Sequence, residues 1–192
     1  MISIRHATVA EKEKTYRWLC LSDTAGLHMG EPNYPEAPIP DWEQFQKDFE
    51  DFYYQIDRRD LGAVMIISND GDEIGCLCYA CFHLNPKSAE LDIWLNQLEH
   101  CGKGLGTTAL KELVAYLQLE LGIERFIIRP AAKNSRAIRA YEKAGFIKVR
   151  HKLATIQTYL LPEYLATYGA GDYGFEQTTV LVLEPVPSVT LR

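Results

Sequence analysis

The heptapeptide Cys101-Gly102-Lys103-Gly104-Leu105-Gly106-Thr107 separates a strand-like segment from an amphipathic helical segment. Its three glycines at alternate positions let the backbone approach a ligand without obstruction by side chains. The first N–H groups of the following helix have no partner within the helix, and its dipole favours an anion at that end. The sequence therefore predicts a phosphate-binding loop.

The spacing of the glycines excludes two common phosphate loops. Gly102, Gly104 and Gly106 form a GxGxG pattern rather than the GxGxxG of dinucleotide-binding folds, and no Gly-Lys-Ser/Thr completes a Walker A sequence. Three glycines before a helix also occur in tight turns that bind nothing. The loop alone leaves both interpretations open.

Hydrophobic periodicity places the loop in a chain of alternating elements. After the loop, apolar residues recur at helical spacing until Gly122 ends the pattern. The patterns elsewhere predict helices over Val9 to Leu21, Trp42 to Ile56 and Ser135 to Ala144. They predict strands over Ile2 to Ala7, Ala63 to Ser68, Glu73 to Leu84, Ala89 to Leu95, Arg125 to Arg129, Phe146 to Thr158 and Thr178 to Glu184.

This order of elements predicts a single α/β domain, a mixed sheet with helices on both faces. The 192 residues, 47% of them hydrophobic, can build one substantial core. No repeat or linker divides residues 1–192. An irregular insertion at about 161–177, a loop or a short helix, is expected before the last strand.

Composition narrows the partners and the compartment. A net charge of -6 and a pI near 5.4 argue against a nucleic-acid surface and favour cationic small molecules. No leader-like or membrane-spanning apolar run is seen, so we expect a cytoplasmic protein without a membrane partner. Cys78-x-x-Cys81 lacks a second ligand pair, so free thiols and no metal are expected among the five cysteines.

A second motif gives the loop its context. The run Asn134-Ser135-Arg136-Ala137-Ile138-Arg139-Ala140-Tyr141-Glu142-Lys143-Ala144-Gly145-Phe146 follows the loop by one helix and one strand. Together they resemble the GCN5-related N-acetyltransferase (GNAT) superfamily, which has a mostly antiparallel sheet, over about Ile2 to Val149 and the last strand. Within it, the motifs look most like those of aminoglycoside 6'-N-acetyltransferases. Cys101 departs from the Gln or Arg usual at its position.

The resemblance implies acetyl-CoA as co-substrate, with its pyrophosphate on the loop amides and Lys103 as a charge partner. It implies that Asn134 binds the pantetheine arm, although a role as helix N-cap would also explain this residue. It further implies that Tyr141 protonates the leaving thiolate, and core packing is the alternative role for this side chain. N–H groups near Leu95 and Asn96 would bind the thioester oxygen. The candidate cofactor-binding residues are Leu95, Cys101, Gly102, Lys103, Gly104, Leu105, Gly106, Thr107, Asn134 and Tyr141.

The strand before the loop supplies acids for an amine acceptor. Glu90, Asp92 and Trp94 alternate with apolar residues, which predicts one acidic and aromatic face. Asp92 is the first candidate for the general base and Glu90 the second, although a solvent-facing acidic strand is the alternative. The candidate catalytic residues are Asp92, Glu90 and Tyr141, and the candidate acceptor-binding residues are Asp92, Trp94, Tyr34 and Trp42.

The predicted function is acetyl transfer to a primary amine of a small polycationic acceptor, with an aminoglycoside 6'-amino group as first candidate. Two alternatives stay open, an N-terminal acetyltransferase of the ribosomal-protein type and a non-catalytic acyl-CoA-binding module. Exposed edge strands and a Tyr-rich stretch near residues 161–177 also leave a homodimer open.

Overall fold

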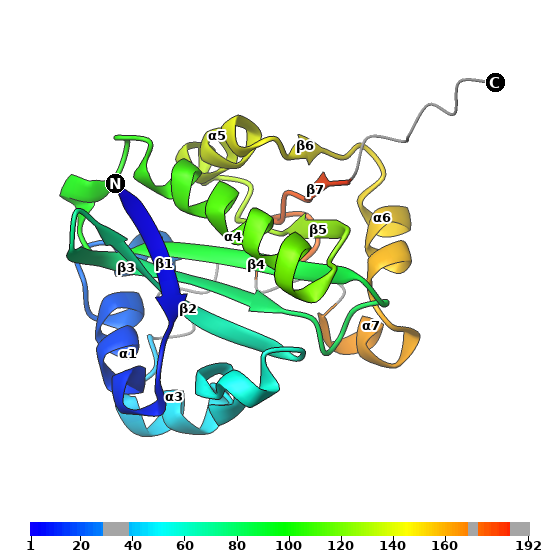
Figure 1. Ribbon diagram of the computed structural model, residues 1–192. Helices are drawn as coiled ribbons and strands as arrows, with labels where there is room; N and C mark the ends of the chain where they lie inside the picture. Colours follow the sequence, from blue (N-terminus) through cyan, green and yellow to red (C-terminus); the bar gives the residue numbers. More distant parts are fainter. Residues whose placement is uncertain (29–38, 169–172, 185–192) are drawn as a thin grey trace.

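The computed structural model describes residues 1–28, 39–168 and 173–184 (Figure 1). Its sheet has seven strands in the order β1-β2-β3-β4-β5-β7-β6. β4 and β5 pair in parallel, and the other pairs are antiparallel, which confirms the mixed, mostly antiparallel sheet. The strands are β1 (Ile2–His6), β2 (Gly62–Asn69), β3 (Asp72–Ala80), β4 (Ser88–Leu95), β5 (Arg125–Ile128), β6 (Ile147–Lys148) and β7 (Leu181–Leu183).

Helices cover both faces of this sheet, as predicted. In Figure 1, α4 and α5 lie above the sheet, α1 and α3 lie below it, and α6 and α7 lie at the right beside β5 and β7. The α-helices are α1 (Lys12–Cys20), α2 (Ala25–His28), α3 (Trp42–Asp48), α4 (Leu105–Leu121), α5 (Ser135–Ala144), α6 (Lys152–Tyr159) and α7 (Pro162–Tyr168). Short 3-10 helices are η1 (Val9–Glu11), η2 (Asp51–Tyr54), η3 (Ile56–Arg58) and η4 (Leu98–His100).

Alternating strand residues divide the core between the two faces. Met65 and Leu77 pack with Leu113 of α4 on one face. Ile66 and Cys76, their neighbours in sequence, pack on the other face with the residues of α1 and α3. A third cluster joins β5 and β7 to α6 through Ile127, Ile156, Tyr159 and Val180.

Local signals set several boundaries as predicted. Asp70 and Gly71 have φ of 52 and 97°, the left-handed pair that a tight hairpin between β2 and β3 requires. Gly122 ends α4 with φ 63°, and Gly145 ends α5 with φ 108°.

Two predicted elements were wrong. The helix predicted over Trp42 to Ile56 ends at Asp48, and two 3-10 turns follow, although the aromatic rings of the segment still stack, with Phe45 and Phe49 centroids 5.0 Å apart. The strand predicted over Phe146 to Thr158 is β6 followed by α6. Ile156, Tyr159 and Leu160 are buried at i, i+3 and i+4, a helical spacing that outweighed the β-branched composition. Part of the expected insertion at 161–177 forms α7.

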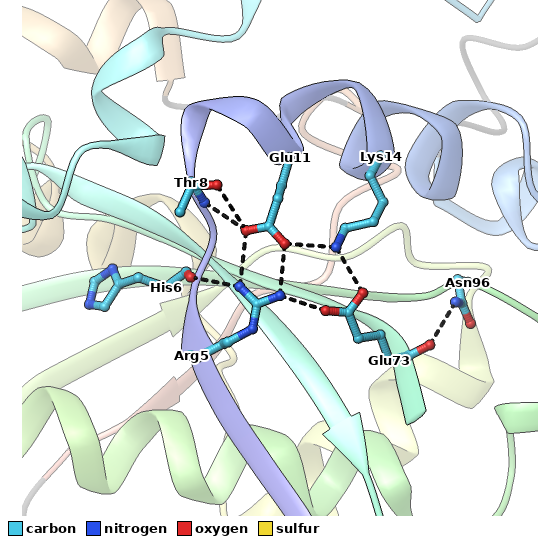
Figure 2. A network of polar contacts seen from close by, with 7 residues as sticks. All are labelled: Arg5, His6, Thr8, Glu11, Lys14, Glu73 and Asn96. Atoms are coloured by element: carbon cyan, nitrogen blue, oxygen red, sulfur yellow. Dashed lines mark hydrogen bonds and ion pairs between the residues drawn. The ribbon is translucent and has the colours of Figure 1, made fainter. Parts of the chain in front are cut away.

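An ion-pair network fixes the outer edge of the sheet (Figure 2). Arg5 of β1 donates to both oxygens of Glu11 at 2.9 and 2.7 Å and to Glu73 of β3 at 2.5 Å. Lys14 of α1 joins the same two carboxylates at 2.7 and 2.8 Å. Asn96, just after β4, donates to the Glu73 carbonyl at 3.1 Å. The network ties α1 to β1 and β3 and reaches the end of β4.

Candidate active site

A cavity of about 600 Å³ lies where β4 and β5 separate. The parallel pairing joins Ser88, Ala89 and Glu90 to β5 and then stops, while β4 runs on to Leu95. Leu110, from the α4 face of the core, and Cys78, from the α1 face, both line the cavity. The cavity wall therefore includes residues from both faces of the sheet.

The glycine loop forms one end of this cavity. Gly102 and Gly104 have φ of 77 and 84°, and a Cβ on either would meet nothing within 4 Å. Glycine is thus required there by backbone conformation, and the space above the backbone is open. Gly106 differs, because a Cβ there would lie 3.3 Å from Ile93 Cδ1, so its role is to let α4 pack on β4.

The first turn of α4 presents its N–H groups at this end. The Thr108 N–H donates to the Gly104 carbonyl at 3.0 Å, so the N–H groups of residues 105–107 precede the helical bonding pattern. Thr107 Oγ1 donates to the Ala140 carbonyl at 3.3 Å and holds the turn against α5. The Lys103 side chain is exposed, and its role as a charge partner stays a prediction. Leu105 packs on the core, so it would serve a ligand through its backbone.

Cys101 precedes the loop as a protonated thiol. Burial raises its pKa, and nearby Arg136 partly opposes that rise. Its Sγ lies 3.8 Å from the Gln97 carbonyl. A neutral thiol in the cavity wall can pack against a ligand but adds no charge.

Asn134 caps α5 and also reaches across the cavity. Its side chain accepts from the Ala137 N–H at 3.1 Å, and its Nδ2 donates to the Leu27 carbonyl of α2 at 3.4 Å. The N-cap interpretation is therefore confirmed, while Asn134 still lines the cavity.

A segment that the sequence did not single out, residues 22–27, connects the two sides of the gap between β4 and α5. Thr24, fully buried, donates from Oγ1 to the Leu95 carbonyl at 2.5 Å. Asp23 accepts the Leu98 N–H at 2.9 Å, and Leu27 contacts Asn134 at the other end. We call residues 22–27 the strap, because they link the end of β4 to the start of α5.

The register of β4 assigns the backbone donor at the cavity. Asn96 donates its N–H to the Ile74 carbonyl at 2.9 Å, so the expectation that this N–H serves a ligand was wrong. Leu95 lies opposite Gly75, and the Asn96–Ile74 bond next to them shows that these two residues are a pair without hydrogen bonds to each other. The N–H and the carbonyl of Leu95 therefore point away from β3. Its carbonyl accepts from Thr24, and its N–H faces the gap beyond β4.

Tyr141 is buried in the cavity wall, 4% exposed. Burial raises its pKa well above the ordinary phenol value, and the Asp92 carboxylate raises it further. The phenol therefore keeps its proton at neutral pH and lies within electrostatic range of Asp92.

Glu90 is held in an ion cluster at the point where the strands separate. Arg129 Nε and Nη2 donate to its two oxygens at 2.5 and 2.7 Å, and His83 Nε2 lies 2.8 Å from Oε2. Burial would raise the pKa of Glu90, but the charge and hydrogen bonds of Arg129 and His83 lower it to about 2. So acidic a carboxylate is a poor proton acceptor. The expectation that Glu90 could serve as the general base in place of Asp92 is thus corrected.

Asp92 and Trp94 share the face of β4 with Glu90, as the alternation predicted. Asp92 is exposed in the cavity wall and accepts the Ile93 N–H at 2.7 Å. Trp94 is 2% exposed and packs with Phe45 and Cys76 in the core below the sheet. The expectation that Trp94 contacts the acceptor is thus corrected.

Other aromatic residues line the cavity in place of the two expected from the sequence. Trp42 packs against Tyr16 at 5.4 Å between ring centroids, and Tyr34 lies outside the described residues. Tyr53, Phe82 and Tyr173 line the cavity instead. Only chain folding brings them together, so no local signal could have identified them.

The described parts of the chain contain no helix long and apolar enough to cross a membrane. Within the same residues, no group of three His, Cys, Asp or Glu side chains is arranged to hold a metal ion. The cavity lining itself includes Asp92, Tyr141 and the basic side chains of Arg136, Arg139 and Lys143.

Comparison of sequences gives short matches to aminoglycoside acetyltransferases and to a kanamycin resistance protein. The chain is 39% identical over 62 residues to an aminoglycoside N(6')-acetyltransferase type 1 of Klebsiella pneumoniae, which is 32% of this chain and 31% of that protein. It is equally similar over 62 residues to a kanamycin resistance protein of Rhizobium radiobacter, of which the match covers 57%. The match thus spans about a third to just over half of these relatives.

Comparison of structures extends over nearly the whole chain. Aminoglycoside acetyltransferase AAC(6')-Ib in complex with coenzyme A and kanamycin superposes with a TM-score of 0.67 at 19% identity, covering 96% of this chain and 95% of that one. Spermidine N-acetyltransferase from Vibrio cholerae in complex with CoA and spermine gives 0.63 at 16% identity, covering 95% of each chain. At these identities the likeness establishes the fold.

The family follows from the sequence itself. Residues 2–147 match the acetyltransferase (GNAT) domain model, a span that contains both the glycine loop and the Asn134–Phe146 motif. This chain therefore belongs to the GNAT acetyltransferase family.

Proposed function

We propose that this protein is an acetyl-CoA-dependent N-acetyltransferase that acts on a primary amine of a small polycationic acceptor. An aminoglycoside 6'-amino group is the first candidate. The observation that carries the proposal is that the glycine loop and Asp92 line one cavity, whose wall includes residues from both faces of the sheet. Donor and acceptor can therefore meet between β4 and β5.

The glycine loop, β4 and α5 form the binding site for acetyl-CoA in this proposal. The N–H groups of the loop bind the pyrophosphate, because Gly102 and Gly104 leave the space above them open. The pantetheine arm then lies between β4 and α5, where Ala137 and Ala140 line the cavity with small side chains. The Leu95 N–H donates to the thioester oxygen, on which negative charge develops during attack.

The acceptor side follows from Asp92 and Tyr141. Asp92 attracts the ammonium form of the acceptor and takes its proton, so that the neutral amine attacks the thioester carbon. The new C–N bond forms as the C–S bond breaks. The Tyr141 hydroxyl, kept protonated by burial, donates to the thiolate that leaves.

The relatives and the cavity wall guide the choice of acceptor. The 39% identical stretch belongs to aminoglycoside acetyltransferases, and the aromatic residues Tyr53, Phe82 and Tyr173 offer flat surfaces to a ring or an ammonium group. A linear polyamine is the second candidate, because the spermine-bound spermidine acetyltransferase has a similar fold.

A thiol-release assay with acetyl-CoA tests the proposal against kanamycin, tobramycin, spermidine and a peptide panel. Turnover with kanamycin and tobramycin supports the first candidate, and turnover with spermidine alone supports the second. Activity on peptides alone would refute both. Tight binding of CoA without turnover of any amine would instead indicate a non-catalytic acyl-CoA-binding module.

A further inference from the structure

Three basic side chains of α5 line the cavity. Arg136, Arg139 and Lys143 recur at i, i+3 and i+7, so they share one face of the helix. The bond from Thr107 to the Ala140 carbonyl places the first turn of α4 against the middle of this row. Burial raises the pKa of Cys101 and Arg136 lowers it, so the charge of Arg136 acts at the glycine loop.

These three cations differ from many others in the chain because no described carboxylate pairs with them. Ion pairs instead engage Arg5, Lys12, Lys14, Arg17, Lys47, Lys87, Arg125 and Arg129. In a chain of net charge -6, a row of unpaired cations along one cavity wall is a local excess of positive charge. Such an excess favours a bound anion.

The pyrophosphate alone does not account for the length of the row. Backbone N–H groups and the dipole of α4 already serve it. From Arg136 to Lys143 the row extends about 10 Å along the helix axis, at 1.5 Å per residue. Coenzyme A carries one further phosphate, the 3'-phosphomonoester of its ribose, and a phosphomonoester is close to doubly charged at neutral pH. Arginine and lysine are the residues that bind such a group.

We propose that Arg139 and Lys143 bind the 3'-phosphate of coenzyme A, with Arg136 placed toward the pyrophosphate. The protein then selects acetyl-CoA over 3'-dephospho-acetyl-CoA and over pantetheine thioesters without the nucleotide. The inference rests on the proposed function in one respect, that a coenzyme A thioester is the donor.

Calorimetric titration with CoA and 3'-dephospho-CoA tests the site without any acceptor. We expect the protein to bind CoA at least about tenfold more tightly than 3'-dephospho-CoA, because a charge-assisted hydrogen bond to the 3'-phosphate contributes that much affinity. In the double variant Arg139→Gln with Lys143→Gln, the ratio should fall close to one, while the affinity for 3'-dephospho-CoA changes less than about twofold. Lys111→Gln is the matched control, since Lys111 is exposed on α4 and should leave the ratio unchanged.

Displacement of CoA by nucleotides separates the ribose phosphate from other phosphate sources. Adenosine 3',5'-diphosphate should compete better than adenosine 5'-diphosphate, and inorganic phosphate should compete least. Equal binding of CoA and 3'-dephospho-CoA, or a ratio that survives in the double variant, would overturn the inference and leave the proposed function intact. No binding of either ligand would defeat the proposed donor as well.

Discussion

Replacing Glu90 by glutamine removes a charged partner of the buried Arg129 guanidinium. Arg129 is 6% exposed at its side chain, and both of its bonds to Glu90 are 2.7 Å or shorter. The pKa of Glu90 falls from 4.5 to about 2, because Arg129 and His83 outweigh burial. At 1.36 kcal/mol per pKa unit this fall corresponds to about 3 kcal/mol. We therefore expect Glu90→Gln to lower the free energy of unfolding by about 3 kcal/mol, in the range found when one partner of a buried pair is removed.

Urea unfolding at neutral pH measures this loss, with Glu43→Gln as the control. Glu43 forms an exposed i,i+4 pair with Lys47, and its loss should cost under about 0.5 kcal/mol. Since the folded pKa of Glu90 is depressed, its contribution is present above the unfolded pKa near 4.5 and disappears as the pH falls toward 2. If Glu90→Gln unfolds like the wild type yet loses turnover, Glu90 takes part in the chemistry and our structural assignment is refuted.

Three further predictions concern the active site and the edge of the sheet. Tyr141→Phe should lower kcat about 100-fold in the thiol-release assay and leave CoA affinity nearly unchanged; an unaltered kcat would remove its acid role. Thr24→Val should lower kcat more than it raises the KM for acetyl-CoA, because the Leu95 carbonyl loses its hydrogen bond from Thr24. Thr24→Ser keeps the hydroxyl and should keep the rate near that of the wild type. Equal rates in the two variants would show that the hydroxyl does not position Leu95. Arg5 and Lys14 lower the pKa values of Glu11 and Glu73, against the opposing effect of burial. The network in Figure 2 should therefore stabilise the fold fully above the unfolded pKa values of these two carboxyl groups, and this stabilisation should decline as the pH falls through their folded pKa values. Thermal melts of Glu73→Gln beside the wild type from pH 7 to pH 3 check this, and parallel melting curves at every pH would contradict it.

Local signals were sufficient for most of the fold. Gly122 and Gly145 end their helices in the left-handed conformation, and Asp70 and Gly71 make the hairpin turn, as their residue types predict. The prediction failed after Phe146, where an apolar segment fits a strand as well as a helix. Only packing against β5 and β7 decides between them, and packing depends on distant residues.

The candidate site was predictable where backbone conformation requires a particular residue type. Gly102 and Gly104 are glycines for their positive φ, and this requirement is visible in the sequence. The ionisation state of Glu90 was not visible in the sequence, because its partner Arg129 lies just after β5, far away in the chain. Thr24 and the cavity-lining aromatic residues Tyr53, Phe82 and Tyr173 were missed for the same reason, since folding alone brings them to the site.

Product analysis tests the central claim most directly. Purified protein is incubated with acetyl-CoA and kanamycin, and the product is analysed by mass spectrometry and NMR beside the Asp92→Asn variant. We predict a singly acetylated kanamycin substituted at the 6'-nitrogen, and a large loss of product with Asp92→Asn although the variant stays folded. No acetylated amine from kanamycin, tobramycin or spermidine, in protein shown to bind CoA, would contradict the account.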